Sequence, residues 1–215
     1  MDYTALVVAA GSGSRVGLGY NKLLYKFENG RTILEETVSI FMNDQRCTQI
    51  IVVASSDDME CFTRLCSCGK VVFVLGGETR QQSVYNGLKA VKEDYVLIHD
   101  GARPWLSREC IDRLLHTLSE YPACLLTVPV KDTIKEVRDG LVVQTFHRAD
   151  LRQAQTPQAF DTNLIIKCYE KAMRSGIQAT DDAQVVETCS DVAVVDVEGS
   201  YENIKVTTME DLVGK

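Results

Sequence analysis

Short apolar runs rich in β-branched residues recur along the chain and predict strands. They occupy positions 4–10, 49–54, 71–75, 95–99, 123–130 and 192–197. Each run is continuously apolar rather than alternating, which is typical of strands covered on both faces. We therefore expect a sheet buried between two layers of helices.

Helical patterns fill the intervals between these runs. Thr32 and Glu35 have the spacing of a capping box, which predicts a helix that ends near residue 42. Apolar residues at helical spacing indicate further helices: Val84, Leu88 and Val91; Ile111, Leu114, Leu115 and Leu118; and Leu164, Cys168 and Ala172. Strands that alternate with helices predict an α/β fold, here one domain over residues 1–215 with three layers and a mostly parallel twisted sheet. Ligands of such sheets bind at the carboxyl ends of the strands.

Residues 131–155 interrupt this alternation. Asp139 and Gly140 form a hairpin-turn signal between two strand-like segments at 133–137 and 141–146. An isolated two-stranded hairpin is barely stable in water. We therefore expect a protruding arm that packs against something else, and a neighbouring subunit is one candidate.

The composition is that of an ordinary globular protein, with 45% apolar and 25% charged residues among 215. Disordered and low-complexity classes are thereby excluded. The net charge of −7 argues against a general nucleic-acid binder, because phosphate backbones require a basic face. A small anionic substrate remains compatible, since it needs only a local basic cluster.

The positions of the cysteines and the lack of long apolar runs indicate where in the cell the protein is located. No stretch approaches the roughly 20 apolar residues of a membrane span, and the N-terminal residues lack the features of a secretory or transit sequence. Several of the eight cysteines lie inside apolar runs, where a reduced thiol packs as a small hydrophobe. We expect a reduced, cytoplasmic protein without a membrane partner.

A glycine-rich turn follows the first strand. It reads AAGSGSRVG from Ala9, with Lys22 shortly after, and such a turn lets backbone N–H groups approach a phosphate. The dinucleotide fingerprint G-x-G-x-x-G fits poorly because Val16 replaces its third glycine, and the G-K-[ST] of a P-loop is absent. Two interpretations stay open: a phosphate site with Arg15 and Lys22, or a plain strand–loop connection with two solvated cations.

Two further turns, each rich in polar residues, follow the carboxyl ends of predicted strands. Gly76 and Gly77 open a helix that carries Arg80 and Ser83 early, where free N–H groups, a guanidinium and a hydroxyl suit the polar edge of a base; an ordinary helix start is the alternative. The sequence HDGARP at 99–104 either forms an ordinary turn or places the Asp100 carboxylate toward a Mg²⁺ ion. No Ser/His/Asp or Cys/His pairing has supporting motif context, so no covalent nucleophile is indicated.

Taken together, the motifs resemble the 2-C-methyl-D-erythritol 4-phosphate cytidylyltransferases, also called 4-diphosphocytidyl-2-C-methyl-D-erythritol synthases, of non-mevalonate isoprenoid biosynthesis. They are AAGSGSR (9–15), NKL (21–23), GGETRQQSVYNGL (76–88), HDGARP (99–104), VPVKDTIK (128–135), QTPQAF (155–160), TDDA (180–183) and EGSYENIKVTT (198–208). The ribitol-5-phosphate cytidylyltransferases share the glycine turn, the HD-x-x-RP block and the NIKVT block. The strings GGETRQQSV and VKDTIK favour the isoprenoid family.

The resemblance implies a Rossmann-like nucleotidyltransferase that joins CTP to a sugar-alcohol phosphate and releases pyrophosphate, with Mg²⁺ bound mainly through the CTP phosphates. The residues that it implies for the nucleotide are the backbone of Ala9, Ala10 and Gly11, the cytosine readers Gly77, Arg80 and Ser83, and Asp100 and Arg103 beside the nucleotide and the metal. It also implies that Arg15 and Lys22 stabilise the transition state at the α-phosphate.

For the acceptor, the resemblance implies that Thr133, Arg148 and Lys205 position the phosphate. It further implies a homodimer in which the arm over 131–155 brings Arg148 to the neighbour's site. An acceptor phosphate monoester is already anionic, which agrees with the missing nucleophile and base pair. The alternatives that stay open are ribitol 5-phosphate as acceptor, a dehydrogenase and a non-catalytic nucleotide-binding regulator.

Overall fold

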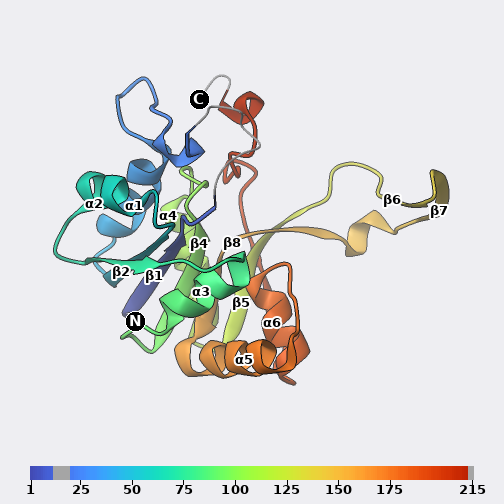
Figure 1. Ribbon diagram of the computed structural model, residues 1–215. Coiled ribbons are helices and arrows are strands. Elements are labelled where there is room, and N and C mark those ends of the chain that lie inside the picture. The colour runs from blue at the N-terminus through green and yellow to red at the C-terminus, as the bar shows by residue number, and fades with distance from the viewer. Residues whose placement is uncertain (12–19, 213–215) are drawn as a thin grey trace.

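A seven-stranded sheet forms the centre of the fold (Figure 1). The structure is a computed structural model, described for residues 1–11 and 20–212. The strands lie in the order β3 (Val71–Leu75), β2 (Cys47–Ala54), β1 (Tyr3–Val8), β4 (Tyr95–Asp100), β8 (Arg152–Asp161), β5 (Ala123–Pro129) and β9 (Val195–Glu198). Within this sheet β8 is antiparallel to both of its neighbours, and the other pairs are parallel. The mostly parallel sheet is therefore confirmed.

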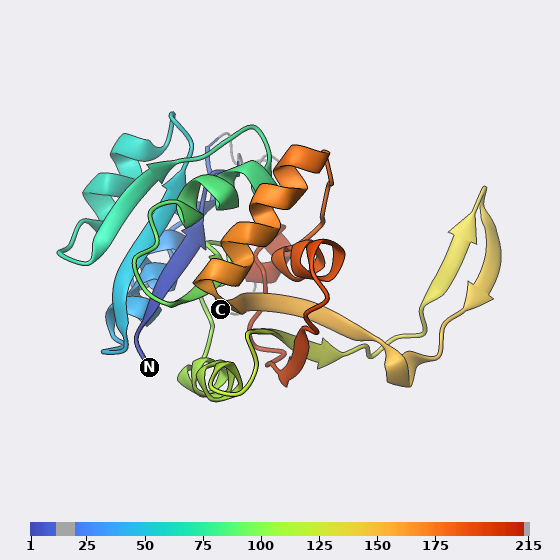
Figure 2. The same cartoon turned by 90° about the horizontal axis from the view of Figure 1, so that it is seen from below.

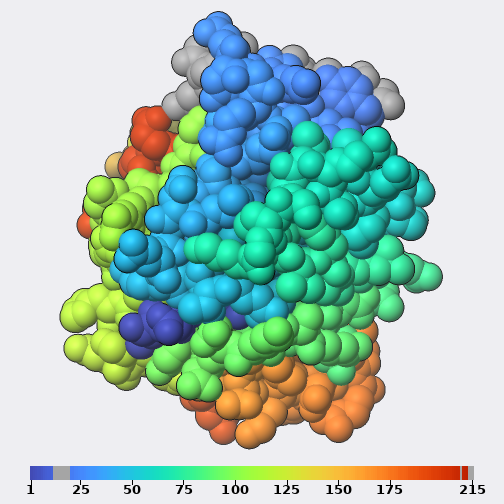
Figure 3. All heavy atoms as spheres, turned by 90° about the vertical axis from the view of Figure 1, so that its left-hand side faces the viewer, coloured from blue at the N-terminus to red at the C-terminus, as the bar shows by residue number. Residues whose placement is uncertain are grey.

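Helices cover both faces of the sheet. The cluster on one face joins α1 (Ile33–Met42), α2 (Met59–Cys66) and α4 (Arg108–Leu118), and the cluster on the other joins α3 (Arg80–Leu88), α5 (Thr162–Ser175) and α6 (Asp182–Cys189). Along β1, Ala5 and Val7 belong to the first cluster and Leu6 to the second, as the alternation of side chains across a strand requires. The three predicted layers are confirmed, and Figure 3 shows the side of the body formed mainly by the first half of the chain.

The capping box that the sequence predicts at the start of α1 is present. The Thr32 side chain accepts from the Glu35 backbone N–H at 3.2 Å, and the Glu35 carboxylate accepts from the Thr32 N–H at 2.8 Å. These bonds satisfy two of the N–H groups that a helix start leaves without partners.

Three elements were not predicted from the pattern: α2, α6 and β8. Strand β8 differs most from expectation, because its buried centre contains the polar residues Gln155, Thr156 and Gln158. A Thr156–Pro157 peptide bond in this strand is cis. The strand inserts between β4 and β5, so its polar residues lie beside the carboxyl end of β4.

The predicted hairpin projects from the body as an arm (Figures 1 and 2). It consists of β6 (Lys135–Arg138) and β7 (Leu141–Thr145), joined by Asp139 and Gly140 with φ values of 51° and 78°. Both values lie in the left-handed region that two-residue hairpin turns need. The projecting part is shorter than the expected 131–155, because β8 begins at Arg152 and pairs with β5 from that residue onward.

Among the helices of residues 1–11 and 20–212, none is both long and apolar enough to cross a membrane.

Candidate active site

A pocket of about 510 Å³ opens where β1, β3 and β4 end. Parallel strands bring their carboxyl ends to one edge of the sheet, which is where such folds bind ligands. The lining residues are Val8, Ala9, Ala10, Gly11, Lys22, Leu23, Gly77, Glu78, Thr79, Arg80, Ser83, Asp100, Ala102 and Lys205. Three turns far apart in the sequence thus share one cavity.

Close approach of two turns shapes the pocket wall. A Cβ on Gly76 would lie 2.5 Å from the Ala10 Cβ and 3.3 Å from the Ala54 carbonyl oxygen. The Gly76 N–H donates to that same carbonyl at 2.8 Å, and the Ala9 N–H donates to the Val53 carbonyl at 2.8 Å. Glycine is required at 76 because any side chain would force these turns apart, whereas an added Cβ on Gly11 meets no atom of residues 1–11 or 20–212 within 4 Å.

Helix α3 begins at the pocket with its first turn already organised. The Thr79 side chain caps the helix by accepting from the Gln82 N–H, and the Ser83 hydroxyl accepts from the Gly77 N–H at 3.0 Å. Arg80 donates two hydrogen bonds to Asp182 of α6, at 3.0 and 2.7 Å. Arg80 and Ser83, which the resemblance implies as readers of cytosine, are therefore held in place by hydrogen bonds to their neighbours.

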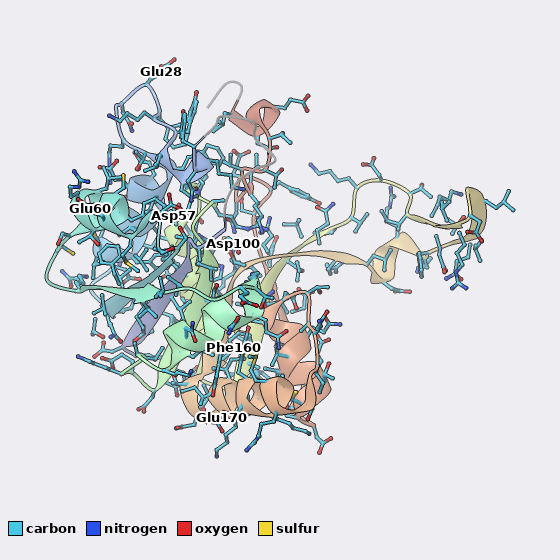
Figure 4. The ribbon with its side chains drawn as sticks, viewed as in Figure 1. Glu28, Asp57, Glu60, Asp100, Phe160 and Glu170 are labelled. Carbon is cyan, nitrogen blue, oxygen red and sulfur yellow. The ribbon has the colours of Figure 1, made fainter. Side chains whose placement is uncertain are left out.

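Asp100 is the anionic centre of the pocket, where β4 ends near the middle of the molecule (Figure 4). Its carboxylate lies 2.8 Å from the Lys205 ammonium and 3.7 Å from both the Arg80 and the Arg103 guanidinium. Burial alone would raise the pKa of Asp100, but the charges of Lys205, Arg80 and Arg103 together hold it below its usual value. Asp100 is therefore ionised across the physiological range.

Lys22 and Lys205 converge on this pocket from opposite ends of the chain. Lys22 starts a short 3₁₀ turn, Lys22–Leu24, and its ammonium donates to the Val206 carbonyl at 2.7 Å. The Val206 N–H in turn donates to the Ala102 carbonyl at 2.8 Å. The segment that carries Lys205 is thus tied to the turn after Asp100, so its ammonium is presented at a fixed place.

A buried chain of hydrogen bonds also fixes the turn that follows Asp100. The Asp100 N–H donates to the Thr156 hydroxyl, which lies 3.0 Å from His99 Nδ1, and His99 Nε2 lies 3.0 Å from the Arg103 carbonyl. Burial lowers the pKa of His99 to about 4, so the ring is neutral at pH 7. The threonine hydroxyl therefore donates to Nδ1, and Nε2–H donates to Arg103. His99 is therefore a packing residue, fully buried and bonded on both ring nitrogens.

A second pocket of about 230 Å³ adjoins the first and shares Lys205 with it. It is lined by Arg103, Val128, Gln153, Ala154, Gln155, Tyr201, Asn203, Ile204 and Lys205. The Arg103 guanidinium donates to the Asn203 carbonyl at 2.6 Å. Within the described part of the chain, Arg103 Nε and the Asn203 side-chain oxygen are buried with no hydrogen-bond partner, and Nε lies 3.7 Å from the Asp100 carboxylate. This second pocket lies where the arm leaves the sheet, since Gln153 and Ala154 pair with β5.

The structure gathers most of the residues that the sequence analysis singled out. Nine of them line the first pocket: Ala9, Ala10, Gly11, Lys22, Gly77, Arg80, Ser83, Asp100 and Lys205. Arg103 lines the second pocket instead, because its guanidinium turns toward Asn203. Arg15 lies outside the described residues. Thr133 and Arg148 lie exposed on the arm and line neither pocket of their own chain.

Two supporting residues were missed in the sequence. Thr156 holds the Asp100 turn, and Asp182 holds Arg80; both side chains are at least 95% buried. The available signal was the motifs that contain them, QTPQ and TDDA, in which polar residues stand where an apolar core pattern would be expected. Polar side chains are seldom buried without hydrogen-bond partners, but the partners could not be identified from the sequence.

Comparison with known proteins identifies the family. Residues 3–214 match the model of the 2-C-methyl-D-erythritol 4-phosphate cytidylyltransferase family. A protein of that name from Bacillus cytotoxicus is 43% identical over 216 residues, covering 98% of this chain and 95% of the relative. One from Bacillus velezensis is 41% identical over 218 residues, covering 99% and 94%.

Solved structures agree with the sequence matches. The 4-diphosphocytidyl-2C-methyl-D-erythritol synthase of Anaerococcus prevotii superposes with a TM-score of 0.86 at 35% identity, covering 99% of this chain and 95% of that one. The 2-C-methyl-D-erythritol 4-phosphate cytidylyltransferase of Thermus thermophilus gives 0.81 at 32% identity, covering 99% and 96%. The chain therefore belongs to the 2-C-methyl-D-erythritol 4-phosphate cytidylyltransferase family of nucleotidyltransferases.

Proposed function

We propose that the first pocket binds CTP and that the adjoining second pocket receives 2-C-methyl-D-erythritol 4-phosphate. The products are 4-diphosphocytidyl-2-C-methyl-D-erythritol and pyrophosphate. The observation that carries the proposal is the convergence of Lys22 and Lys205 with Asp100 at the border of the two pockets. An acidic protein concentrates cations there, where two anionic substrates must meet.

For the nucleotide, we assign the backbone of Ala9, Ala10 and Gly11 to the phosphates and ribose, because this turn borders the pocket and Gly11 leaves it open. Gly77, Arg80 and Ser83 are assigned to the cytosine base. Backbone N–H groups and hydroxyls at a helix start supply donors of fixed direction.

In the chemical step an oxygen of the acceptor phosphate forms a bond to the α-phosphorus of CTP. The bond between the α-phosphorus and the bridging oxygen breaks, and pyrophosphate leaves with that electron pair. No general base is needed, because the acceptor is already anionic. The obstacle is repulsion: two unit charges about 4 Å apart interact by roughly 4 kcal/mol at an effective dielectric constant near 20.

Lys22 and Lys205 offset this repulsion. Both lie at the pocket on short, tethered segments, so little reorganisation accompanies the reaction. Arg15 is expected to assist Lys22 at the α-phosphate, and that role stays a prediction. Each well-placed donor to developing charge is worth about 10²- to 10³-fold in rate.

Asp100 suits a Mg²⁺ ion that is held mainly by the CTP phosphates. Its ionised carboxylate borders the pocket, and Mg²⁺ at nucleotide sites commonly takes one or two protein carboxylates. Among residues 1–11 and 20–212, no group of three His, Cys, Asp or Glu side chains is arranged to hold a metal by itself. When bound, the ion would neutralise part of the negative charge of the phosphates.

For the acceptor, Lys205 and Arg103 face the second pocket from one chain, and Thr133 and Arg148 come from the arm of a partner copy. Six apolar side chains of the arm are exposed: Ile134, Val137, Leu141, Val142, Val143 and Phe146. A hairpin of this kind is unstable alone, and an exposed apolar patch marks an interface. These exposures support a homodimer built through the arm.

We further propose a cytoplasmic location. All eight cysteines are unpaired thiols, which suits a reducing compartment.

Pyrophosphate release tests the function. The protein is incubated with CTP, Mg²⁺ and either 2-C-methyl-D-erythritol 4-phosphate or ribitol 5-phosphate. We expect release with the first acceptor and little with the second. The reverse preference would transfer the assignment to the ribitol alternative, and CTP binding without turnover on either acceptor would favour the non-catalytic regulator.

Mixing two impaired variants, assayed at an acceptor concentration below the wild-type KM so that each variant alone is nearly inactive, tests the shared site. Lys22→Ala has a defective pocket and an intact arm. Arg148→Ala has an intact pocket and a defective arm. Each heterodimer then contains one intact composite site, so a random equimolar mixture should recover about a quarter of wild-type activity. No recovery in heterodimers confirmed by mass spectrometry would contradict a site shared between subunits.

A further inference from the structure

Arg80 is placed where a cation is locally unfavourable. It is the first residue of α3, and a helix start carries a partial positive charge that disfavours a guanidinium. Burial alone would lower the pKa of Arg80, but Asp182 raises it above the ordinary value. Asp182 thus offsets the cost of placing Arg80 at a helix start. This compensation indicates that the fixed guanidinium has a role.

Asp182 holds Arg80 from a distant element. Its carboxylate is fully buried at the start of α6 and accepts from both terminal nitrogens of the guanidinium, at 3.0 and 2.7 Å. Such end-on bidentate pairing fixes the plane of the guanidinium as well as its position. The helices α3, α5 and α6 that surround this pair lie side by side (Figures 1 and 2).

Asp182 is itself held from two sides. The buried Tyr169 hydroxyl of α5 donates to the same carboxylate at 2.5 Å, and the Tyr169 ring stacks on Tyr85 of α3. Burial and the Asp182 charge raise the pKa of Tyr169, so the hydroxyl keeps its proton. Gln158 of β8 fixes the helix start by donating to Asp181 and accepting from the Ala183 N–H.

The charge balance of Arg80 indicates which ligand group it meets. Asp182 is bonded to it, and Asp100 lies 3.7 Å away, so two carboxylates flank one guanidinium. A cation compensated in this way attracts a phosphate weakly, yet it keeps its N–H groups as donors in fixed directions. A neutral acceptor atom on the nucleobase matches such a donor better than a phosphate does.

We propose that Asp182, supported by Tyr169 and Gln158, is a positioning residue that locks Arg80 as a donor toward the base and so contributes to selecting cytosine. The proposal rests on the proposed function, in which the first pocket binds CTP. Cytosine presents two neighbouring acceptors, O2 and N3, whereas N3 of uracil carries a hydrogen. A rigid donor discriminates between these bases better than a mobile one, because the mismatched donor pair cannot move apart.

The test is Asp182→Asn, which keeps the side-chain shape but places an amide N–H against a donor of Arg80 or Tyr169. We expect KM for CTP to rise about 10-fold, the ratio of kcat/KM for CTP over UTP to fall by a similar factor, and kcat to change less than about 3-fold. Tyr169→Phe, a milder change, should move the same ratio in the same direction. Asp191→Asn, an exposed aspartate after α6, is the matched control.

A double variant shows whether Asp182 acts through Arg80. If it does, Arg80→Met combined with Asp182→Asn loses no more CTP preference than Arg80→Met alone. Additive losses overturn the proposal. A lower melting temperature of Asp182→Asn with an unchanged CTP to UTP ratio of kcat/KM also overturns the proposal. If Asp182→Asn does not fold, an unchanged ratio in Tyr169→Phe overturns it. Wild-type protein that fails to use CTP would instead overturn the proposed function.

Discussion

The pocket and the arm differ in how their polar residues are held. In the pocket, Asp100 is ion-paired with Lys205 and Arg80, and Arg80 is also ion-paired with Asp182. On the arm, the side chain of Arg148 is exposed and donates one hydrogen bond, to the Lys131 carbonyl at 2.6 Å. The polar residues of the pocket are held by partners within one chain, whereas Arg148 of the arm lies exposed in the single chain.

This difference shows which part of the proposed site is already organised in the single chain. Among the described residues, the proposed CTP side of the site is already held by hydrogen bonds and ion pairs, and electrostatic catalysis would benefit from that rigidity. In the proposed function, the acceptor side would depend on residues that a second copy brings into position. We therefore expect changes in the pocket to affect turnover and changes on the arm to affect assembly and acceptor affinity.

The largest expected effect is on Lys22. Lys22→Ala removes a cation from the meeting point of the substrates and should lower kcat by about 10² or more without changing the oligomeric state. Pyrophosphate release measures the rate, with Lys167→Ala, an exposed lysine on α5, as control. Near-normal turnover would remove Lys22 from the mechanism.

The next effect concerns assembly through the arm. Leu141 is 73% exposed in the single chain, and Leu141→Asp would bury a carboxylate in the proposed interface. The dimer dissociation constant should rise about 30-fold, because an unpaired buried charge is costly. Light scattering over a dilution series measures it. An unchanged dimer, or a wild-type protein that stays monomeric, would contradict the arm as an interface.

A smaller effect is expected for acceptor binding. Arg148→Ala removes a charged hydrogen-bond donor and should raise KM for the acceptor about 20-fold. CTP affinity, measured by calorimetry, should stay as in the wild type. Arg138→Ala, on the same arm and paired with Glu136, is the matched control. A loss confined to CTP affinity would rule out the acceptor role.

The smallest effect is on the stability of the pocket side. His99 has a pKa of about 4 when folded and an ordinary value near 6.5 when unfolded. Between these values the unfolded chain binds the extra proton, so stability falls as pH drops from 6.5 toward 4. The cost at pH 5.5 is about 1 kcal/mol.

Urea unfolding at pH 7.5 and 5.5 measures this contribution of His99. In His99→Asn the histidine part of the pH dependence should disappear, although the variant itself is less stable at both pH values. His116→Asn, an exposed histidine on α4, should keep the wild-type difference. An equal pH dependence in His99→Asn and wild type would show that His99 is not a buried neutral group.

Local patterns were sufficient for much of the fold. The continuous apolar runs of β1 and β2, the capping box at Thr32 and the Asp139–Gly140 turn each depend on neighbouring residues, and each was predicted. The glycine turns of the site were found for the same reason, since strand ends are visible in the sequence.

Strand β8 was missed because its burial depends on distant partners. Thr156 bonds to Asp100 and His99, and Gln158 bonds to the start of α6. These partners are 25 to 57 positions away, so no window of neighbouring residues distinguishes this strand from a polar loop. The same limit hid the role of Asp182, whose partner Arg80 is 102 positions away.

The root of the arm also lies in the wall of the second pocket, through Gln153 and Ala154. An acceptor held between two chains would therefore strengthen their association by mass action, and its removal would weaken it. In a cell, such a shared site would make the specific activity rise with the amount of protein made. A small change in expression would then alter flux more than proportionally near the dissociation constant of the dimer.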